Sequence, residues 1–233
     1  FIIEIIMYWN EEKKTEKFEI PDDIVDLSFV IKCKCLPLEH MHSLSDTLFT
    51  VLPWLKDEKL AGLHPINGAE SGNGLERSNE PNELIYLSRL QKMTLRLPKE
   101  RLESAEGLIG QTLNVDGHDI EIGKSSIKKL SDLPTAFCRS IMVDGRMDED
   151  DFLKWAFEEL KALDISVRKM MPGKERVVKL PDNQERITRS LMVAELEQAE
   201  SVRLQQHGMG EGRKLGCGIF MPQKDIKAVN SDD

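Results

Sequence analysis

The sequence predicts an α+β protein built from two consecutive units with the element order β-α-β-β-α-β. Two kinds of periodicity support this class. Apolar residues alternate with polar ones in several segments, as in half-buried strands, and recur every three or four residues in others, as in helices. The two kinds of segment follow one another in the same order in each half of the chain. Leu133-Pro134 lies between the halves and is the expected domain boundary.

The first half opens with a strand at residues 26–35, where alternate side chains share one face: Leu27, Phe29, Ile31, Cys33 and Cys35. Pro37 ends this strand, and apolar spacing over 39–55 then predicts a helix with a bend at Pro53. Residues 62–83 are rich in Gly, Asn, Pro and Ser and predict an irregular connection, with Ile66 in a short strand. Strands are expected within 84–97, a short helix after Pro98, and a hairpin at 113–122 around an Asp-Gly turn.

The second half repeats this order. A strand is expected at 135–143, followed by a helix whose acidic residues at 148–151 suit a helix N-terminus. Two strands at 167–178 and 187–194 are joined by a turn at 181–183, and a helix at 197–206 leads through a glycine-rich loop to a last strand at 217–221. Two such units imply tandem ferredoxin-like (RRM-like) domains, a scaffold that hosts many unrelated functions.

The expected domain limits follow from these elements. Residues 1–23 form an N-terminal extension, 24–133 the first ferredoxin-like domain, 134–229 the second with the glycine-rich loop, and 230–233 a tail. The aromatic signature of RNA-recognition motifs is missing, so base stacking on an open sheet is not expected.

The charge of the chain restricts its partners. A net charge of −9 over 233 residues argues against a general nucleic-acid coat. The distribution is uneven, because residues 168–189 carry seven basic and three acidic side chains. Such a strip suits one particular RNA or phosphate ligand, and it also suits a solvated hairpin.

Cysteine usage and the N-terminus bear on location. The four cysteines form no Cys-x-x-Cys pair, so neither a zinc knuckle nor a redox motif is expected, and reduced thiols indicate a cytoplasmic protein. The apolar residues 1–9 are too short to span a membrane and lack the flanks of a signal peptide. The chain begins with Phe1, which suggests a fragment or an extended reading frame, with Met7 as an alternative start. Neither a membrane partner nor a cofactor is expected.

The most unusual stretch is 207–220, His-Gly-Met-Gly-Glu-Gly-Arg-Lys-Leu-Gly-Cys-Gly-Ile-Phe, which holds five of the fifteen glycines. Glycine lets a ligand approach the main chain closely. Arg213 and Lys214 add positive charge beside backbone N–H groups, which suits a phosphate. The alternative is a flexible loop before the last strand. A Walker-type phosphate loop is not expected, because Gly-Lys-Ser/Thr is absent.

These features together resemble a known family. Two ferredoxin-like units, a histidine at the first strand-to-helix junction and Gly-x-Gly-x-x-x-Gly-x-Gly near the C-terminus are similar to the CRISPR-associated repeat-processing endoribonucleases, a RAMP-type family. The resemblance covers about residues 24–229 and is closest to the Myxan-type branch. The stretches that carry it are Pro-Leu-Glu-His at 37–40, Asn-Gly-Ala-Glu-Ser-Gly-Asn-Gly at 67–74, 94–101, Thr-Arg-Ser-Leu-Met-Val-Ala at 188–194, and 201–220.

The resemblance implies a function. It implies a metal-independent cut within each repeat of a precursor CRISPR RNA, in which a 2′-hydroxyl attacks the adjacent phosphate and leaves a 2′,3′-cyclic phosphate and a 5′-hydroxyl. The partners implied are the CRISPR repeat RNA and the stem-loop of the crRNA. The protein is expected to remain bound to this stem-loop after the cut. A further implied partner is a crRNA-guided multisubunit complex for interference or for transposition.

Histidine suits both proton transfers of such a reaction near neutral pH. His40 matches the family's histidine at the start of the first helix, which makes it the expected general acid or base. On its residues alone, His40 also fits a partly buried structural histidine. His42 lies about 200° further around the helix and is the weaker candidate. His64 is expected to be structural and His118 exposed, and no tyrosine matches a catalytic motif.

Basic and glycine residues of the second half are the expected RNA contacts, because phosphate contacts position an RNA stem that is recognised largely by shape. They are Arg168, Lys169, Lys174, Arg176, Arg189, Ser190, His207, Gly210, Gly212, Arg213, Lys214, Gly216 and Gly218. No metal site is expected. Two other functions remain open: a subunit that binds the crRNA hairpin without cutting efficiently, and a ferredoxin-like protein that binds a nucleotide in metabolism or regulation.

Overall fold

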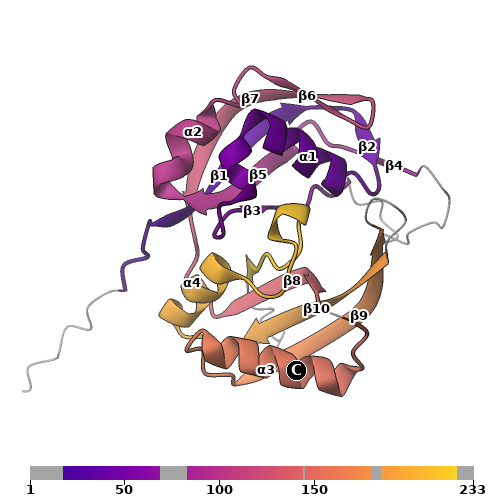
Figure 1. Ribbon diagram of the computed structural model, residues 1–233. Helices are drawn as coiled ribbons and strands as arrows, with labels where there is room; N and C mark the ends of the chain where they lie inside the picture. The colour runs from indigo at the N-terminus through magenta and orange to yellow at the C-terminus, as the bar shows by residue number, and fades with distance from the viewer. Residues whose placement is uncertain (1–17, 69–82, 144, 180–184, 225–233) are drawn as a thin grey trace, which may run out of the picture.

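The computed structural model describes residues 18–68, 83–143, 145–179 and 185–224. Strands that lie between residues 24 and 129 build a first domain, and strands that lie between residues 135 and 223 build a second. Figure 1 shows one domain above the other, with the glycine-rich loop between them. None of the helices in these ranges is long and apolar enough to cross a membrane.

The first domain has a five-stranded antiparallel sheet in the order β3-β5-β1-β7-β6. Its strands are β1 (Ile24–Lys32), β3 (Gly62–Leu63), β5 (Lys92–Pro98), β6 (Thr112–Val115) and β7 (His118–Lys129). Its helical elements are α1 (Met41–Val51), η1 (Pro53–Lys56), η2 (Lys99–Arg101) and α2 (Leu102–Glu106), and β2 (Cys35–Pro37) pairs separately with β4 (Leu84–Tyr86). Without β6, the strand order and the helices after β1 and β5 are those of a ferredoxin-like unit.

The second domain has a four-stranded antiparallel sheet in the order β11-β8-β10-β9, again the ferredoxin-like order. Its elements are β8 (Thr135–Met142), α3 (Glu149–Ala162), β9 (Lys169–Lys179), β10 (Glu185–Ala194), α4 (Gln198–His207), η4 (Arg213–Leu215) and β11 (Met221–Gln223). Asp148 caps α3 by accepting a hydrogen bond from the Asp151 N–H, and Glu197 with Glu200 forms a capping box on α4.

Each domain has its own apolar core, and a third, smaller cluster joins residues of both. That cluster packs Ile24 of β1 and Leu130 against Val202 of α4. Beside it lies the buried Arg96 side chain of β5, which pairs with Asp26 and donates hydrogen bonds to two carbonyl oxygens of the second domain. The domains therefore share buried polar and apolar contacts.

Three expected elements differ from the structure. The strand predicted at 26–35 ends at Lys32, and the following short strand pairs elsewhere, with β4. Ile66 is buried but lies outside any strand, and β3 occupies 62–63 instead. The last strand begins at Met221, because the apolar residues before it are buried by packing: Ile219 lies directly against Gly62 of the first domain. The predicted turn at 181–183 lies outside the described residues.

Candidate active site between the two domains

His40 stands immediately before α1, at its N-cap position. β2 ends at Pro37, and the Pro37 carbonyl oxygen accepts two hydrogen bonds from His40, one from the backbone N–H at 3.2 Å and one from ring Nδ1 at 2.8 Å. These contacts hold the imidazole beside the end of β2. The residue is 2% exposed.

The hydrogen bond to Pro37 determines the tautomer of His40. A carbonyl oxygen only accepts, so Nδ1 carries the proton and Nε2 presents a lone pair. Nε2 is buried and has no hydrogen-bond partner among the described residues. Burial lowers the pKa of His40, and the backbone groups of Pro37 and Leu38 offset this only in part. The ring is therefore neutral at neutral pH, and its Nε2 can accept a proton.

A cavity of about 390 Å³ adjoins His40 and is lined by both domains. The first domain contributes residues next to His40 and the segment from Pro65 to Gly68, and the second contributes β8, β9 and the glycine-rich loop. The charged side chains that line it are Glu39, Arg139, Lys174, Glu175 and Arg176. Three basic side chains against two acidic ones leave this partly apolar cavity with an excess of positive charge beside a neutral histidine, which suits a phosphate-containing ligand.

The glycine-rich loop reaches this cavity because it lies close against the first domain. Gly216 has a φ of +79°, and a Cβ there would lie 2.9 Å from Met41 Cε of α1. Glycine alone combines this left-handed backbone with so close an approach. Leu215, Gly216 and Cys217 consequently line the same cavity as His40.

Comparison with known proteins identifies the family. The family model described as Cas6 Crispr matches residues 25–225. The chain belongs to the Cas6 family. The resemblance drawn from its motifs, to the CRISPR repeat-processing endoribonucleases, is thereby confirmed.

Individual relatives agree with this assignment. The chain is 29% identical over 207 residues to the CRISPR-associated endonuclease Cas6 of Myxococcus xanthus (strain DK1622), covering 89% of this chain and 85% of that protein. It superposes on a solved structure titled CRISPR associated protein Cas6 with a TM-score of 0.60 at 10% identity, over 86% of this chain and 100% of the other. A structure titled "An RAMP protein binding different RNA substrates" gives 0.59 at 12% identity, over 86% and 99%. The predicted tandem ferredoxin-like fold is confirmed.

In this Cas6-family protein, Lys174 and Arg176 are the predicted RNA contacts that lie with His40. Both belong to β9 and line the cavity, which Met41 at the start of α1 also lines. Gly216 completes the set of predicted residues found there.

Arg213 of the loop makes structural contacts. Its guanidinium is largely buried and donates hydrogen bonds to the carbonyl oxygens of Gln206, His207 and Leu60. Burial, together with the charge of Arg96, lowers the pKa of Arg213 to about 10, so the group stays charged at neutral pH. Arg213 thus joins the end of α4 to the first domain.

Lys214 makes a similar contact, since its Nζ donates to the Lys56 carbonyl oxygen at the end of η1, at 2.7 Å. Burial lowers the pKa of this amine. Both basic residues of the loop are therefore directed at main-chain oxygens of the protein.

The remaining basic candidates lie on other parts of the second domain. Arg168 pairs with Glu197 and Glu200 at the start of α4, and Lys169 is exposed beside it at the beginning of β9. Arg189 pairs with Glu149 and Glu175. These side chains do not line the cavity that adjoins His40.

The other predicted RNA contacts of the second domain, a serine, a histidine and three glycines, also lie outside the lining of the cavity. Ser190 is buried in β10, with its Oγ against Gly173. His207 is exposed. Gly210, Gly212 and Gly218 all have positive φ, and Gly218 would place a Cβ 2.3 Å from the Met209 carbonyl oxygen. These glycines shape the loop.

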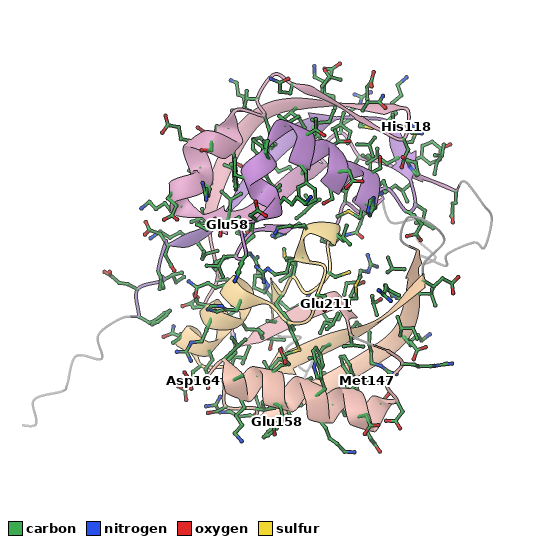
Figure 2. All side chains as sticks on the ribbon, in the orientation of Figure 1. Glu58, His118, Met147, Glu158, Asp164 and Glu211 are labelled. Atoms are coloured by element: carbon green, nitrogen blue, oxygen red, sulfur yellow. The ribbon has the colours of Figure 1, made fainter. Side chains whose placement is uncertain are left out.

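The other histidines lie away from the cavity. His42 pairs with Asp46 one turn along α1. His64 is buried and donates to Asp26, as expected of a structural residue. Figure 2 labels His118 at the outer edge of the first domain, where it is half-buried with Nδ1 3.7 Å from Cys35 Sγ, rather than fully exposed. Within the described ranges, no group of three or more His, Cys, Asp or Glu residues could hold a metal ion.

Arg139 was not among the predicted residues, although it lines the cavity. Its strand offered a signal: Ala136 and Cys138 of β8 are buried in the core of the second domain, so Arg139 lies on the opposite face. The sequence does not reveal that the face of the sheet that carries Arg139 contacts the first domain.

Proposed function

We propose that this protein is the endoribonuclease that cuts CRISPR precursor RNA within its repeats, and that His40 acts as the general base. The observation that carries the proposal is the state of His40. A neutral imidazole with an unpartnered Nε2 lies beside a cavity lined by basic side chains of the other domain. Family membership supports RNA cleavage as the reaction class.

The proposed reaction is a transphosphorylation. His40 Nε2 accepts the proton of the 2′-hydroxyl while O2′ bonds to the adjacent phosphorus. The bond from phosphorus to O5′ breaks, and the leaving oxygen takes a proton from water. The products are a 2′,3′-cyclic phosphate and a 5′-hydroxyl, and the imidazolium returns its proton to solvent. No step requires a metal-bound water.

The hydrogen bond from Nδ1 to Pro37 contributes to this role. It fixes the ring orientation and keeps the lone pair on Nε2 directed away from the end of β2. Because the residue is 2% exposed, the scissile nucleotide has to reach it through the cavity. Entry of the nucleotide would displace water and strengthen the electrostatic contacts with the phosphate.

The RNA is held from the second domain in this proposal. Lys174 and Arg176 line the cavity and would contact backbone phosphates near the cut, while the exposed Lys169 at the beginning of β9 would extend the contact along the hairpin stem. The cleaved crRNA hairpin stays bound, and the complex joins a multisubunit effector for interference or transposition. Retention of the stem after cleavage is consistent with contacts made largely to phosphates and shape.

The test is to incubate the protein, in the presence of EDTA, with the repeat RNA encoded by the array beside its gene. The chemical groups at the ends of the products are then identified. The wild-type protein should give one cut with a cyclic phosphate end. His40→Ala should lose cleavage by at least about 100-fold while it retains RNA binding. His42→Ala, in the first turn of α1 and two residues after His40, is the matched control, and it should cut normally because that side chain pairs with Asp46.

Other outcomes separate the rival functions. Tight hairpin binding without any cut by the wild type would make the protein a crRNA-binding subunit. Cleavage that stops in EDTA would refute the metal-independent mechanism. Absence of affinity for the hairpin would contradict both RNA functions and leave the nucleotide-binding alternative.

A further inference from the structure

Arg139 of β8 lies in the cavity lining and is anchored across the domain junction. Its Nη1 donates a hydrogen bond of 2.7 Å to Asn67 Oδ1 of the first domain. Asn67 also lines the cavity, a few residues after Pro65. One edge of the guanidinium is thus fixed by a neutral acceptor, and the group stands in the same hollow as His40.

The charge of Arg139 is not neutralised within the described part of the chain. Among these residues no carboxylate lies within ion-pair distance of it, whereas Arg168 and Arg189 each pair with two glutamates. A half-buried guanidinium held by an amide oxygen keeps its full charge for a ligand. This combination is that of an anion-binding group.

We propose that Arg139 binds the scissile phosphate and stabilises the charge that builds on it during the cut, with Asn67 as its positioning residue. The inference rests on the proposed ribonuclease function. It adds a catalytic residue from the second domain to a base from the first. The reaction therefore requires the two domains to hold His40 and Arg139 in a fixed position relative to each other.

The chemistry needs such a group. When O2′ bonds to phosphorus, negative charge accumulates on the non-bridging oxygens before the bond to O5′ breaks. A guanidinium can donate two parallel N–H bonds to these oxygens and remains protonated throughout, so it transfers no proton. His40 alone supplies no positive charge at this stage, because burial keeps its ring neutral before it takes the proton.

The role of Asn67 also accounts for part of a motif. Asn67 opens the stretch at 67–74 that resembles the family, and its side chain accepts the hydrogen bond from Arg139. An asparagine holds the guanidinium without cancelling its charge, whereas an aspartate at this position would form an ion pair that competes with phosphate.

The experiment compares single-turnover cleavage by saturating protein with affinity for a repeat RNA that carries a 2′-deoxynucleotide at the cut. Arg139→Ala should slow cleavage about 100-fold while its Kd for the deoxy RNA changes by less than about tenfold. Millimolar guanidinium should restore part of the rate. The cleavage rate of Arg139→Lys should fall between those of the wild type and Arg139→Ala, because lysine keeps the positive charge but lacks the two parallel N–H donors of the guanidinium.

The second variant tests positioning. Asn67→Asp retains the acceptor oxygen and adds attraction to Arg139, so a purely structural contact would be preserved or strengthened. We expect slower cleavage in Asn67→Asp with an undiminished unfolding temperature. Guanidinium should rescue Arg139→Ala selectively over Asn67→Asp.

Lys161→Ala provides the charge control. Lys161 lies on α3 in an exposed ion pair with Glu158, which Figure 2 labels on the side of the second domain away from the first. This variant removes one positive charge without touching the cavity, so its cleavage rate should equal that of the wild type.

The outcomes distinguish this inference from the proposed function. If the wild type cuts and His40→Ala does not, but Arg139→Ala cuts at the wild-type rate, the function stands and the role of Arg139 is refuted. A rate loss in Arg139→Ala without rescue by guanidinium, matched by an equal loss of affinity for the deoxy RNA, also overturns it. A wild type that fails to cut refutes the proposed function itself, and this inference with it.

Discussion

Replacing Arg96 by methionine tests how the two domains are joined. The Arg96 side chain is fully buried, with Nε 2.8 Å from Asp26 Oδ1 and Nη2 3.0 Å from Asp26 Oδ2. Nη1 donates to the carbonyl oxygens of Gln205 and Phe220 in the second domain, at 2.8 and 2.9 Å. Methionine fills similar space but makes none of these hydrogen bonds.

The expected loss of unfolding free energy follows from the polar groups that stay buried without a partner. In Arg96→Met, His64 is the one partner that the Asp26 carboxylate keeps among the described residues, and two carbonyl oxygens of the second domain lose the Arg96 donor. Breaking a buried ion pair by removal of one partner costs about 3–5 kcal/mol. For a chain of this length that corresponds to a fall in unfolding temperature of roughly 6–20 °C. Asp26→Asn should cost a similar amount, because it leaves the guanidinium uncompensated.

The assay is urea unfolding of both single variants and the double variant. Because the two residues share one network, the double variant should be more stable than the sum of the single losses predicts, by about 0.5–3 kcal/mol. Lys32→Ala is the control: its ion pair with Glu121 is exposed, and its removal should leave the unfolding midpoint unchanged. If Arg96→Met lost less than about 1 kcal/mol, the reasoning about the buried pair would be wrong.

The pH dependence of stability provides an independent check. Burial alone would raise the pKa of Asp26, but the hydrogen bond from His64 and the charge of Arg96 outweigh it and hold the pKa well below its usual range. A carboxyl with a depressed folded-state pKa stabilises the fold above its unfolded pKa, about 3.9, and loses this contribution as pH falls. Stability of the wild type should therefore decline below about pH 4, and Arg96→Met should decline less over that interval.

Three further predictions concern the site and its loop. The cleavage rate should rise with pH and reach half its maximum below pH 6.5, because burial lowers the pKa of His40 and the base must be deprotonated; a rate that falls above neutrality would make His40 an acid instead. Gly218→Ala should destabilise the fold by about 2 kcal/mol or more in urea, since its φ of +67° and the Met209 carbonyl oxygen exclude a Cβ. Arg213→Ala should lower stability by about 3 kcal/mol while the salt dependence of RNA binding stays as in the wild type, because its hydrogen bonds are internal; a flatter salt dependence at normal stability would instead make it a phosphate contact.

The element order could be predicted because local patterns carry it. Helix α3 has acidic residues at its start and a regular apolar face, and the hairpin of β6 and β7 has its Asp-Gly turn. The last strand was misplaced for a physical reason. Ile219 is buried against Gly62 of the first domain, and Phe220 is buried in the core of the second domain without belonging to a strand. An apolar run looks the same in sequence whether it pairs in a sheet or packs against a neighbouring segment.

The candidate site was predictable only in part. The motif that contains His40 selected it as the candidate catalytic residue, but the hydrogen bond that sets its tautomer depends on the end of β2. Arg213 carries charge in a glycine-rich stretch, which suggests a ligand contact, yet its partners are carbonyl oxygens brought near by folding. Arg139 and Asn67 are 72 positions apart, so their contact follows from how the two domains pack and from no local pattern.

The most direct test of the central claim, that the 2′-hydroxyl is the nucleophile activated at His40, uses a repeat RNA with a single 2′-deoxynucleotide on the 5′ side of the cut. If His40 activates the 2′-hydroxyl, the protein should bind this RNA as tightly as the all-ribose repeat and leave it uncut, while it cuts the all-ribose RNA at that position. Cleavage of the deoxy-substituted RNA at the same phosphate would contradict it, because attack would then come from a different nucleophile.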